Sequence, residues 1–277
     1  MKEVDLHIHT TFSDGKLTPY QVIERAYYKD IAAVGITDHD TMRGISQAME
    51  AGRIFGIEVV PGVELSTYYA GKELHILGYY CRAENFLLKK TLAFVRLDRY
   101  NRIVKMLALL KKEGIDLDLK DVLALAAGGE SLGRPHLAEA LCQKGYCQTP
   151  VEAFQRFLGD GKPAYVKRLK ISSYNAIRLI RRSGGIAVLA HPGLYKKDGL
   201  IPLLKLHGLS GIEAFHPDHR SAECRRYCQM GLKYNLLITG GSDFHGQGSG
   251  SSAAPGAVVV DYGCLDRLKR AVGNPKC

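Results

Sequence analysis

The sequence lacks several features that would place it in other classes of protein. None of its apolar runs approaches the roughly 18 residues that a membrane span needs. Its first residues show no signal-peptide pattern, because Met1-Lys2-Glu3 leads directly into an apolar segment. We find no internal repeat, low-complexity tract or disordered linker. We therefore expect a cytoplasmic protein with no membrane association and no obligate protein partner.

Cysteine pairs at metal-binding spacing are also missing. The chain has seven cysteines, an odd and scattered set without a Cys-x-x-Cys pair. Cys224 and Cys228 have helical i,i+4 spacing, but no second pair of Cys or His lies at zinc-finger distance. The pattern therefore predicts reduced thiols in the cytosol rather than a disulfide framework or a structural zinc site.

The composition that remains is that of an ordinary globular protein with a basic surface. At 277 residues, with 46% hydrophobic and 24% charged residues, the chain can bury a full core. The formal net charge of +10 favours an anionic partner such as a phosphate ester, a nucleotide or a nucleic acid. The basic residues are dispersed along the chain rather than collected in a tail.

Short apolar strands alternate with helices, which predicts an α/β fold with a mostly parallel sheet. The first helix has a clear start at Thr18-Pro19-Tyr20-Gln21, where a capping residue is followed by proline and a capping-box glutamine. The expected strands are Val4–Ile8, Ala32–Ile36, Glu58–Val63, Glu73–Gly78, Ile186–Ala190, Gly211–Phe215, Leu236–Thr239 and Ala257–Val260.

The strand signal disappears between about residues 85 and 165. We expect an all-helical insertion there, between two halves of one domain that span 1–84 and 166–277. Its first helix should end at Gly114, and a basic run on it is more typical of a solvated helix face than of an RNA track. The apolar stripe of this helix is Leu97, Ile103, Val104, Leu107 and Leu110, and the basic run is Arg96, Arg99, Arg102 and Lys105.

Two histidines near the start of the chain suggest metal chemistry. His7 and His9 lie in an apolar, β-branched segment that reads as a buried strand. Side chains two residues apart on a strand point to the same face, so the two imidazoles should lie side by side. Paired imidazoles suggest a shared metal ion, although a lone pair of this kind is more often ordinary packing.

Further ligand-type residues recur at or near the ends of the expected strands. They are Asp14, His39, Glu64, His75, His191, Asp243 and His245. In a parallel barrel such ends converge on one face, where active sites form. Imidazole and carboxylate ligands without thiolate suit Zn, Mn or Fe. Nine candidate ligands exceed what one ion needs, so we expect two or three divalent ions, an arrangement suited to displacement at phosphorus.

These motifs resemble the PHP superfamily, the polymerase and histidinol phosphatase domain. The motifs are His7-Ile8-His9, Asp14, Thr37-Asp38-His39-Asp40, Glu64, His75, His191 and Ser242-Asp243-Phe244-His245. The resemblance covers residue 4 to about residue 260. It implies a distorted (β/α)₇ barrel of the PHP type, with metal ions on one face and an all-helical insertion.

The resemblance also implies a set of ligands for each ion. One ion would be held by His7, His9, Glu64 and Asp243. A second would use Glu64, His75 and His191, with Glu64 bridging, and a third would use Asp14, His39 and His245. We expect Asp38 and Asp40 to support ligands rather than to bind metal, and Asp5 could equally be a structural carboxylate.

The closer likeness is to stand-alone bacterial phosphoesterases with a helical insertion. The motifs that carry it are Gly133-Arg134-Pro135-His136-Leu137-Ala138 and Gly161-Lys162-Pro163-Ala164-Tyr165-Val166. Similar proteins act on nucleoside 3′,5′-bisphosphates, on nucleoside monophosphates, or on short RNA from its 5′ end. The insertion then looks like a cap over the barrel mouth. Substrate contacts are expected from Arg134, His136 and His216, and a proton donor from His191 or else His219.

We therefore expect a phosphoric ester hydrolase that uses a metal-bound hydroxide on a small nucleotide. Three alternatives stay open. The first is a 5′→3′ exonuclease on short RNA, and the second is histidinol-phosphate phosphatase. The third is a non-catalytic PHP module that serves a DNA polymerase, for which degraded ligands and a longer chain would be typical.

Overall fold

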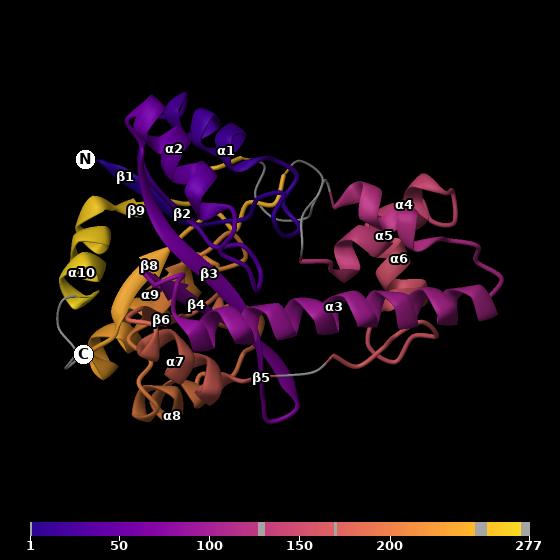
Figure 1. Cartoon of the computed structure of the whole chain (residues 1–277). Coiled ribbons are helices and arrows are strands. Elements are labelled where there is room, and N and C mark those ends of the chain that lie inside the picture. Colours follow the sequence, from indigo (N-terminus) through magenta and orange to yellow (C-terminus); the bar gives the residue numbers. More distant parts are fainter. Residues whose placement is uncertain (1, 127–130, 169–170, 247–253, 273–277) are drawn as a thin grey trace.

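The computed structural model describes residues 2–126, 131–168, 171–246 and 254–272, and a curved, mixed sheet forms the centre of the fold (Figure 1). The strand order is β8-β7-β6-β4-β3-β2-β1-β9, with β5 beside β3. The strands are β1 Glu3–Ile8, β2 Ile31–Ile36, β3 Glu58–Tyr69, β4 Lys72–Tyr79, β5 Ile171–Ser172, β6 Ile186–Leu189, β7 Gly211–Phe215, β8 Leu237–Gly240 and β9 Val260–Asp261.

Helices surround this sheet and also build a separate lobe. They are α1 Pro19–Tyr27, α2 Ile45–Phe55, α3 Phe86–Lys112, α4 Leu119–Leu125, α5 Arg134–Gln143, α6 Pro150–Ala153, α7 Ser173–Arg182, α8 Leu200–Leu206, α9 Ser221–Tyr234 and α10 Tyr262–Val272, with a π-helix at Phe154–Leu158 and a 3₁₀ helix at Pro192–Leu194. The capping box at Thr18 and Gln21 is present at the start of α1. No helix in the described ranges is both long and apolar enough to cross a membrane.

The sheet contains an antiparallel segment that the sequence pattern did not indicate. β3 continues six residues past the expected end at Val63 and turns at Ala70 and Gly71 into β4, which it pairs antiparallel. Both turn residues have positive φ, which matches the twist of a tight hairpin. β4 also pairs antiparallel with β6, whereas β1, β2 and β3 are parallel neighbours. The expected strand boundary at Val63 was therefore wrong.

The sheet nearly closes into a barrel between β1 and the segment that follows β8. Ile8 bridges Phe244, and the backbone N–H of His9 donates to the Phe244 carbonyl at 3.0 Å. A Cβ at Gly241 would lie 2.4 Å from the backbone nitrogen of His7, so only glycine permits this close approach. The expected α/β barrel is confirmed, and its closure brings Asp243 beside the two histidines of β1.

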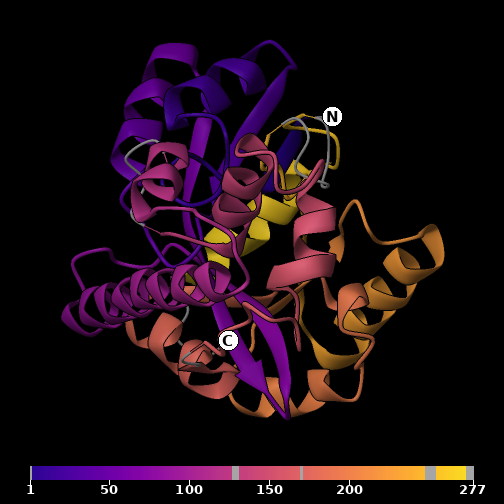
Figure 2. The same ribbon diagram turned by 90° about the vertical axis from the view of Figure 1, so that its right-hand side faces the viewer.

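The insertion has a hydrophobic cluster of its own. Residues from α3, α4, α5, α6 and the π-helix form it, and none of the barrel strands contributes. In Figures 1 and 2 these helices lie over one end of the barrel. The helix α3 belongs to both parts, because Leu88 and Leu92 pack into the barrel cluster and Ile103 and Leu110 into the insertion cluster.

The expected faces of α3 need two corrections. Leu97 and Val104 of the predicted apolar stripe are 58% and 41% exposed. Arg99, which was expected on a solvated basic face, is instead buried. The helix packs against two different bodies along its length, so a single helical stripe does not describe its buried side. Its predicted end is correct, since Gly114 follows it with φ of 78°.

Candidate metal centre

The two histidines of β1 face each other across a small space. Their Nε2 atoms lie 3.1 Å apart, and both side chains are fully buried. The alternation of side chains along β1 places both rings on the inner face of the sheet, as predicted. Two neutral imidazoles with converging nitrogens leave room for a cation that both can bind.

Glu64 is the centre of the arrangement. It lies in the middle of the extended strand β3, not at a strand end as expected, and is 1% exposed. Five imidazoles surround its carboxylate. The nitrogen–oxygen distances are 3.4 Å to His7, 3.2 Å to His9, 3.1 Å to His39, 2.9 Å to His75 and 3.0 Å to His191. One carboxylate within reach of so many rings can bridge two ions.

Two aspartates complete the polar face. Asp243 lies 3.2 Å from His7 and 3.1 Å from His9 through Oδ1. Asp14 lies 3.4 Å from His245 and 3.8 Å from His39. The loops that follow β1 and β8 therefore meet at this end of the barrel, as the strand-end positions predicted.

Eight of the nine predicted ligands fall into three overlapping groups, in each of which one ligand atom per residue lies within 4.8 Å of all the others. The groups are His9, Asp14, His39 and His245; His7, His9, Glu64 and Asp243; and His39, Glu64 and His75. The ninth residue, His191, lies outside these groups but directs Nε2 at Glu64. Each pair of groups shares one residue, so the groups form a single cluster.

The donor set fits divalent metal ions. Three of its buried atoms have no hydrogen-bond partner, namely Asp14 Oδ1, Asp243 Oδ1 and His39 Nδ1. These atoms lie close to other candidate ligands without forming a hydrogen bond of good geometry, and buried polar atoms in that state are costly unless a cation satisfies them. Imidazole and carboxylate without thiolate is the mixture that zinc, manganese and iron accept. The cluster is therefore chemically suited to hold divalent ions.

The electrostatics of the cluster favour ionised carboxylates. Burial alone would raise the pKa of Glu64, but the charges of His39 and His75 outweigh it and hold that pKa well below its usual range. The pKa of Asp243 is also held well below its usual range. Burial alone would raise it, but the charges of His7 and His245 outweigh that effect. Two buried anionic groups thus face the histidines, as a cation site requires.

Residues around the ligands fix their positions. Asp38 accepts hydrogen bonds from Thr10 N, Thr10 Oγ1 and Ser13 Oγ at 2.6–2.7 Å, which orders the loop that carries Asp14. Asp5 accepts from the backbone N–H groups of Ser242 and Gly256 at 2.9 and 2.8 Å. Both have the supporting role that the sequence suggested for them.

The sequence reasoning missed two supporting residues. Glu213 is fully buried in β7, with Oε1 2.9 Å from His7 Nδ1 and Oε2 accepting from the backbone N–H of His191 at 2.8 Å. Tyr195 Oη lies 2.9 Å from His191 Nδ1 and accepts from the backbone N–H of His75 at 2.8 Å. For Glu213, the signal available in the sequence was a lone carboxylate inside the apolar strand Gly211–Phe215.

Three non-glycine residues of this face have positive φ. They are Asp40 at 55°, His191 at 27° and Asp243 at 48°. Such backbone conformations cost free energy and persist where the surroundings enforce them, often at functional sites. Two of the three are predicted ligands, and the third directly follows His39.

Asp40 also anchors the insertion to the metal face. It is buried and forms ion pairs with Arg99 of α3 at 2.6 Å and with Arg168 at 2.5 Å. Arg99 further donates to Ser66 Oγ at 3.1 Å, in the strand that carries Glu64. We call Asp40, Arg99 and Arg168 the arginine clamp. It joins the middle of α3 and the segment that follows the insertion to the loop of His39.

The predicted substrate residues lie in different settings. Arg134 is 22% exposed and lies 3.4 Å from Asp160. Burial alone would raise the pKa of Glu73, but a hydrogen bond with His75 and the charges of His75, Arg168 and Arg134 hold it well below its usual range. His136 is buried, and its Nδ1 accepts from Gly133 N at 3.1 Å. Burial holds the pKa of His136 below its usual value, and the opposing effects of Asp14 and of a hydrogen bond with the Ser13 backbone do not reverse this.

The two remaining histidines are engaged within the barrel. His216 Nε2 lies 3.3 Å from Asp243 Oδ2, and its Nδ1 accepts from Asp218 N at 3.1 Å. His219 uses both ring nitrogens on backbone groups: Nδ1 lies 3.0 Å from the Ala214 carbonyl, and Nε2 accepts from Gly193 N at 3.0 Å. This bonding disfavours the predicted proton-donor role of His219.

Comparison with known proteins identifies relatives along most of the chain. The chain is 34% identical over 246 residues to the phosphoribosyl 1,2-cyclic phosphate 1,2-diphosphodiesterase of Eggerthella lenta, covering 88% of this chain and 94% of the relative. It is 34% identical to the 5′-3′ exoribonuclease of Haemophilus influenzae, covering 88% and 90%. It is 32% identical to the 3′,5′-nucleoside bisphosphate phosphatase of Chromobacterium violaceum, covering 90% of each.

A solved structure and a family match agree with these relatives. A protein of Bifidobacterium adolescentis, assigned as a metal-dependent phosphoesterase, superimposes with a TM-score of 0.90 at 28% identity, covering 96% of this chain and 94% of the other. Residues 5–146 match the PHP domain. The match includes six of the nine predicted ligands, from His7 to His75. The chain therefore belongs to the PHP domain family of metal-dependent phosphoesterases.

Proposed function

We propose that this phosphoesterase hydrolyses a phosphate ester of a small nucleotide, with a nucleoside 3′,5′-bisphosphate or monophosphate as substrate. The observation that carries the proposal is the cluster of three overlapping ligand groups, two of which contain Glu64. Closely spaced cation sites suit a substrate with phosphoryl oxygens, since several charges must be neutralised at once. The net charge of +10 also favours an anionic substrate.

Two or three ions of Mn, Fe or Zn would occupy the cluster. The first would be held by His7, His9, Glu64 and Asp243, the second by Glu64, His75 and His191, and the third by Asp14, His39 and His245. When bound, the ions would supply a water that ionises near neutral pH and would neutralise charge on the phosphoryl oxygens. Glu213 orients His7, and Tyr195 orients His191, through the hydrogen bonds described above.

The insertion would act as a cap that carries the substrate-binding arginine. Arg134 begins α5, and its charge is one of those that lower the pKa of Glu73, whose Oε1 lies 3.5 Å from His75 Nε2. A guanidinium can bind a phosphate through two parallel hydrogen bonds. His136, which is hydrogen-bonded to the Ser13 backbone in the Asp14 loop, and His216, which contacts Asp243, would support this contact. Both ring nitrogens of each predicted proton donor are engaged, those of His191 with Glu64 and Tyr195 and those of His219 with backbone groups, which disfavours both as the source of the proton for the leaving oxygen.

A second candidate function is 5′→3′ hydrolysis of short RNA. The likeness to the Haemophilus influenzae exoribonuclease supports it, at 34% identity against 32% for the bisphosphate phosphatase. The helical insertion disfavours histidinol-phosphate phosphatase, and the complete ligand set disfavours a non-catalytic polymerase module. Free thiols at the six described cysteines are consistent with the predicted cytoplasmic location.

Phosphate release from a substrate panel with added Mn²⁺ tests the proposal. The panel holds a nucleoside 3′,5′-bisphosphate, a nucleoside monophosphate, 5′-phosphorylated di- to pentaribonucleotides, phosphoribosyl 1,2-cyclic phosphate and histidinol phosphate. We expect the highest kcat/KM on the bisphosphate, with an Arg134→Ala variant raising KM and Arg134→Lys restoring part of it. Activity on none of these compounds would refute the proposal.

A further inference from the structure

The helix α3 exposes an apolar face to solvent. It runs from the barrel to the insertion (Figure 1), and the side chains that it buries lie on one of its sides. On the opposite side, six exposed side chains follow one another at alternating intervals of three and four residues. We call this set the outer face of α3: Leu87, Lys90, Phe94, Leu97, Asn101 and Val104. A helix that is buried on one side normally exposes polar residues on the other, so this face is suited to a partner.

The spacing of the outer face is that of a helix that pairs with another helix. Alternating intervals of three and four residues are the a and d positions of a heptad, which form the seam between the helices of a coiled coil. The pattern extends from Leu87 to Val104, over about 26 Å of helix. Phe94 and Leu97, at its middle, are 55% and 58% exposed. The partner that this spacing fits is therefore a second helix.

The order of side chains on the outer face is the same in both directions along the helix. It runs apolar, polar, apolar, apolar, polar, apolar. A second copy of α3 in the antiparallel direction, related by a two-fold axis between residues 95 and 96, therefore meets this face with apolar opposite apolar. Phe94 lies opposite the partner's Leu97, and Leu87 lies opposite the partner's Val104. Such a self-complementary surface is what a two-fold symmetric interface requires.

The two polar residues favour the antiparallel direction over the parallel one. In the antiparallel pair, Lys90 lies opposite the partner's Asn101, whose amide oxygen can accept from the ammonium group. In a parallel pair, each Lys90 would lie opposite its own copy, and the like charges would repel. A single polar position within an apolar seam also fixes the register of the two helices. An unrelated partner helix would not need this symmetric order, so the order selects a second copy of this chain.

The exposed apolar area approaches what a dimer needs. Phe86 and Tyr100 flank the outer face and are 77% and 39% exposed. At the usual size of such side chains, these two and the four apolar residues of the outer face expose roughly 600 Å² in each chain. A standard interface buries about 800 Å² per partner, and Lys90 and Asn101 supply part of the remainder. An interface of this size is compatible with a dimer whose Kd is micromolar.

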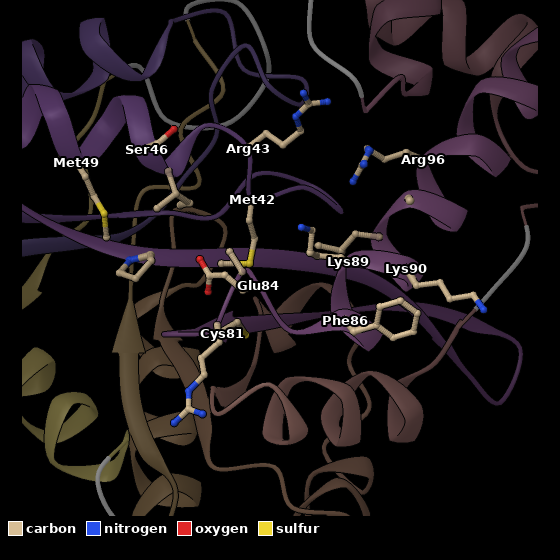
Figure 3. A pocket seen from close by; sticks show the side chains of 16 residues that line it. Met42, Arg43, Ser46, Met49, Cys81, Glu84, Phe86, Lys89, Lys90 and Arg96 are labelled. Atoms are coloured by element: carbon tan, nitrogen blue, oxygen red, sulfur yellow. The ribbon is translucent and has the colours of Figure 1, made fainter.

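The outer face is separate from the features on the other sides of α3. A groove of about 1060 Å³ lies between α3, the start of α2 and the loop after β4. Lys89 points into this groove, whereas Lys90 points away from it (Figure 3). Arg99, which pairs with Asp40, is buried on the inner side of the helix. Pairing through the outer face therefore leaves the arginine clamp in place.

We propose that the protein forms a two-fold symmetric homodimer in which the outer faces of two α3 helices pack antiparallel. The inference goes beyond the proposed function, because it concerns a surface that carries none of the candidate metal ligands or substrate residues. Its support is the heptad spacing, the symmetric order of the six side chains and the exposed apolar area.

Sedimentation equilibrium of the full chain with Mn²⁺, from about 1 to about 200 µM, tests the dimer. We expect the wild type to pass from monomer to dimer with a Kd of about 10 µM. Leu97→Glu places a charge beside the two-fold axis in both chains and should raise this Kd at least about 100-fold. Leu232→Glu is the matched control, since Leu232 is 83% exposed on α9, and it should stay within about twofold of the wild type.

A charge placed at Asn101 tests the direction of the helices. In the antiparallel pair, Asn101→Glu lies opposite the partner's Lys90 at two symmetric places, so the Kd should fall about fivefold. In a parallel pair, the two new carboxylates would face each other and the Kd would rise. The double variant Lys90→Ala/Asn101→Glu should lose the gain, because the partner charge is gone.

The fold of each variant is checked where dimerisation plays no part. At about 1 µM the wild type is mainly monomeric, so the thermal midpoint of Leu97→Glu should equal that of the wild type there. If Leu97→Glu unfolds at a lower temperature, Val104→Glu at the other end of the outer face repeats the sedimentation test.

Three outcomes would overturn the inference. A wild type that stays monomeric at about 200 µM would leave the outer face to a different helical partner. A dimer that Leu97→Glu and Val104→Glu do not weaken would lie on another surface. A Kd that rises in Asn101→Glu would exclude the antiparallel pair. Hydrolysis does not enter these measurements, so the dimer and the proposed function stand or fall separately.

Discussion

The carboxylate of Glu213 lies 2.9 Å from Nδ1 of His7 and thereby leaves Nε2 of that ring to face the metal cluster. Its other oxygen accepts the backbone N–H of His191 at 2.8 Å. A single buried residue of β7 therefore positions one candidate ligand on β1 and another just after β6. Such outer residues fix the orientation and the tautomer of a metal-binding histidine.

Replacing this carboxylate should weaken metal binding without removing a ligand. Glu213→Gln keeps the size of the side chain but loses the negative charge opposite His7. We expect the affinity for Mn²⁺ to fall by roughly 10- to 100-fold, which is the usual effect of losing such a partner. Metal content after dialysis against buffered Mn²⁺ measures this, with Glu50→Gln on the exposed face of α2 as the control. Unchanged Mn²⁺ affinity would mean that Glu213 is only a packing residue.

Removing Glu64 should have a larger effect. Five histidines lie within 3.4 Å of its carboxylate, so Glu64→Ala leaves the first two proposed ions without their shared anionic ligand. We expect phosphate release to fall to background and the bound metal to decrease by at least one ion per chain. Elemental analysis beside the activity assay measures both, with the exposed Glu113→Ala as control. Full metal content and activity in Glu64→Ala would contradict the ligand assignment.

The sequence predicted the ligand types better than their positions. His7 and His9 could be placed together because a strand repeats every two residues, and Asp243 because parallel strand ends converge. Glu64 was placed at a strand end, since nothing in Val63-Glu64-Leu65 signals that β3 runs on into a hairpin. The tight turn at Ala70 and Gly71 decides this, and alanine is not a typical residue for positive φ.

Long-range partners were beyond the reach of local patterns. The helical spacing of Arg96, Arg99, Arg102 and Lys105 predicts a solvated basic face, yet Arg99 pairs with Asp40, which lies 59 residues away in the chain. Glu213 looked like one polar residue in an apolar strand, and only the barrel closure brings it beside His7. In both cases the burial of the charge depends on which elements the fold brings together.

Breaking the arginine clamp should destabilise the protein. Arg99→Met retains the length of the side chain but leaves Asp40 buried with Arg168 as its remaining ion-pair partner. Removing one partner of a buried ion pair typically costs about 3–5 kcal/mol of the free energy of unfolding, and the second arginine should hold the loss near the lower figure. Guanidinium chloride denaturation measures the change, with the exposed Lys105→Met on the same helix as control. Equal stability of the two variants would show that Arg168 alone neutralises Asp40.

Cys81 should make the stability of the fold fall at alkaline pH. It is 5% exposed, and burial raises the pKa of its thiol from 9.0 to about 11. Between pH 9 and 11 the unfolded chain loses this proton while the folded protein retains it, so the free energy of unfolding decreases as the pH rises. A pKa difference of two units corresponds to about 3 kcal/mol of the free energy of unfolding, and all of this stabilisation is present below pH 9.

The comparison of wild type with Cys81→Ala isolates this effect from the titration of lysines and tyrosines, which both proteins share. The variant loses packing at every pH, so it should be the less stable protein at pH 8. The difference between the two should then shrink between pH 9 and 10.5, because only the wild type carries a thiol that unfolding allows to ionise. Guanidinium chloride denaturation at half-unit intervals of pH measures it. A difference that stays constant over this range would show that the Cys81 thiol ionises as readily in the folded protein as in the unfolded chain.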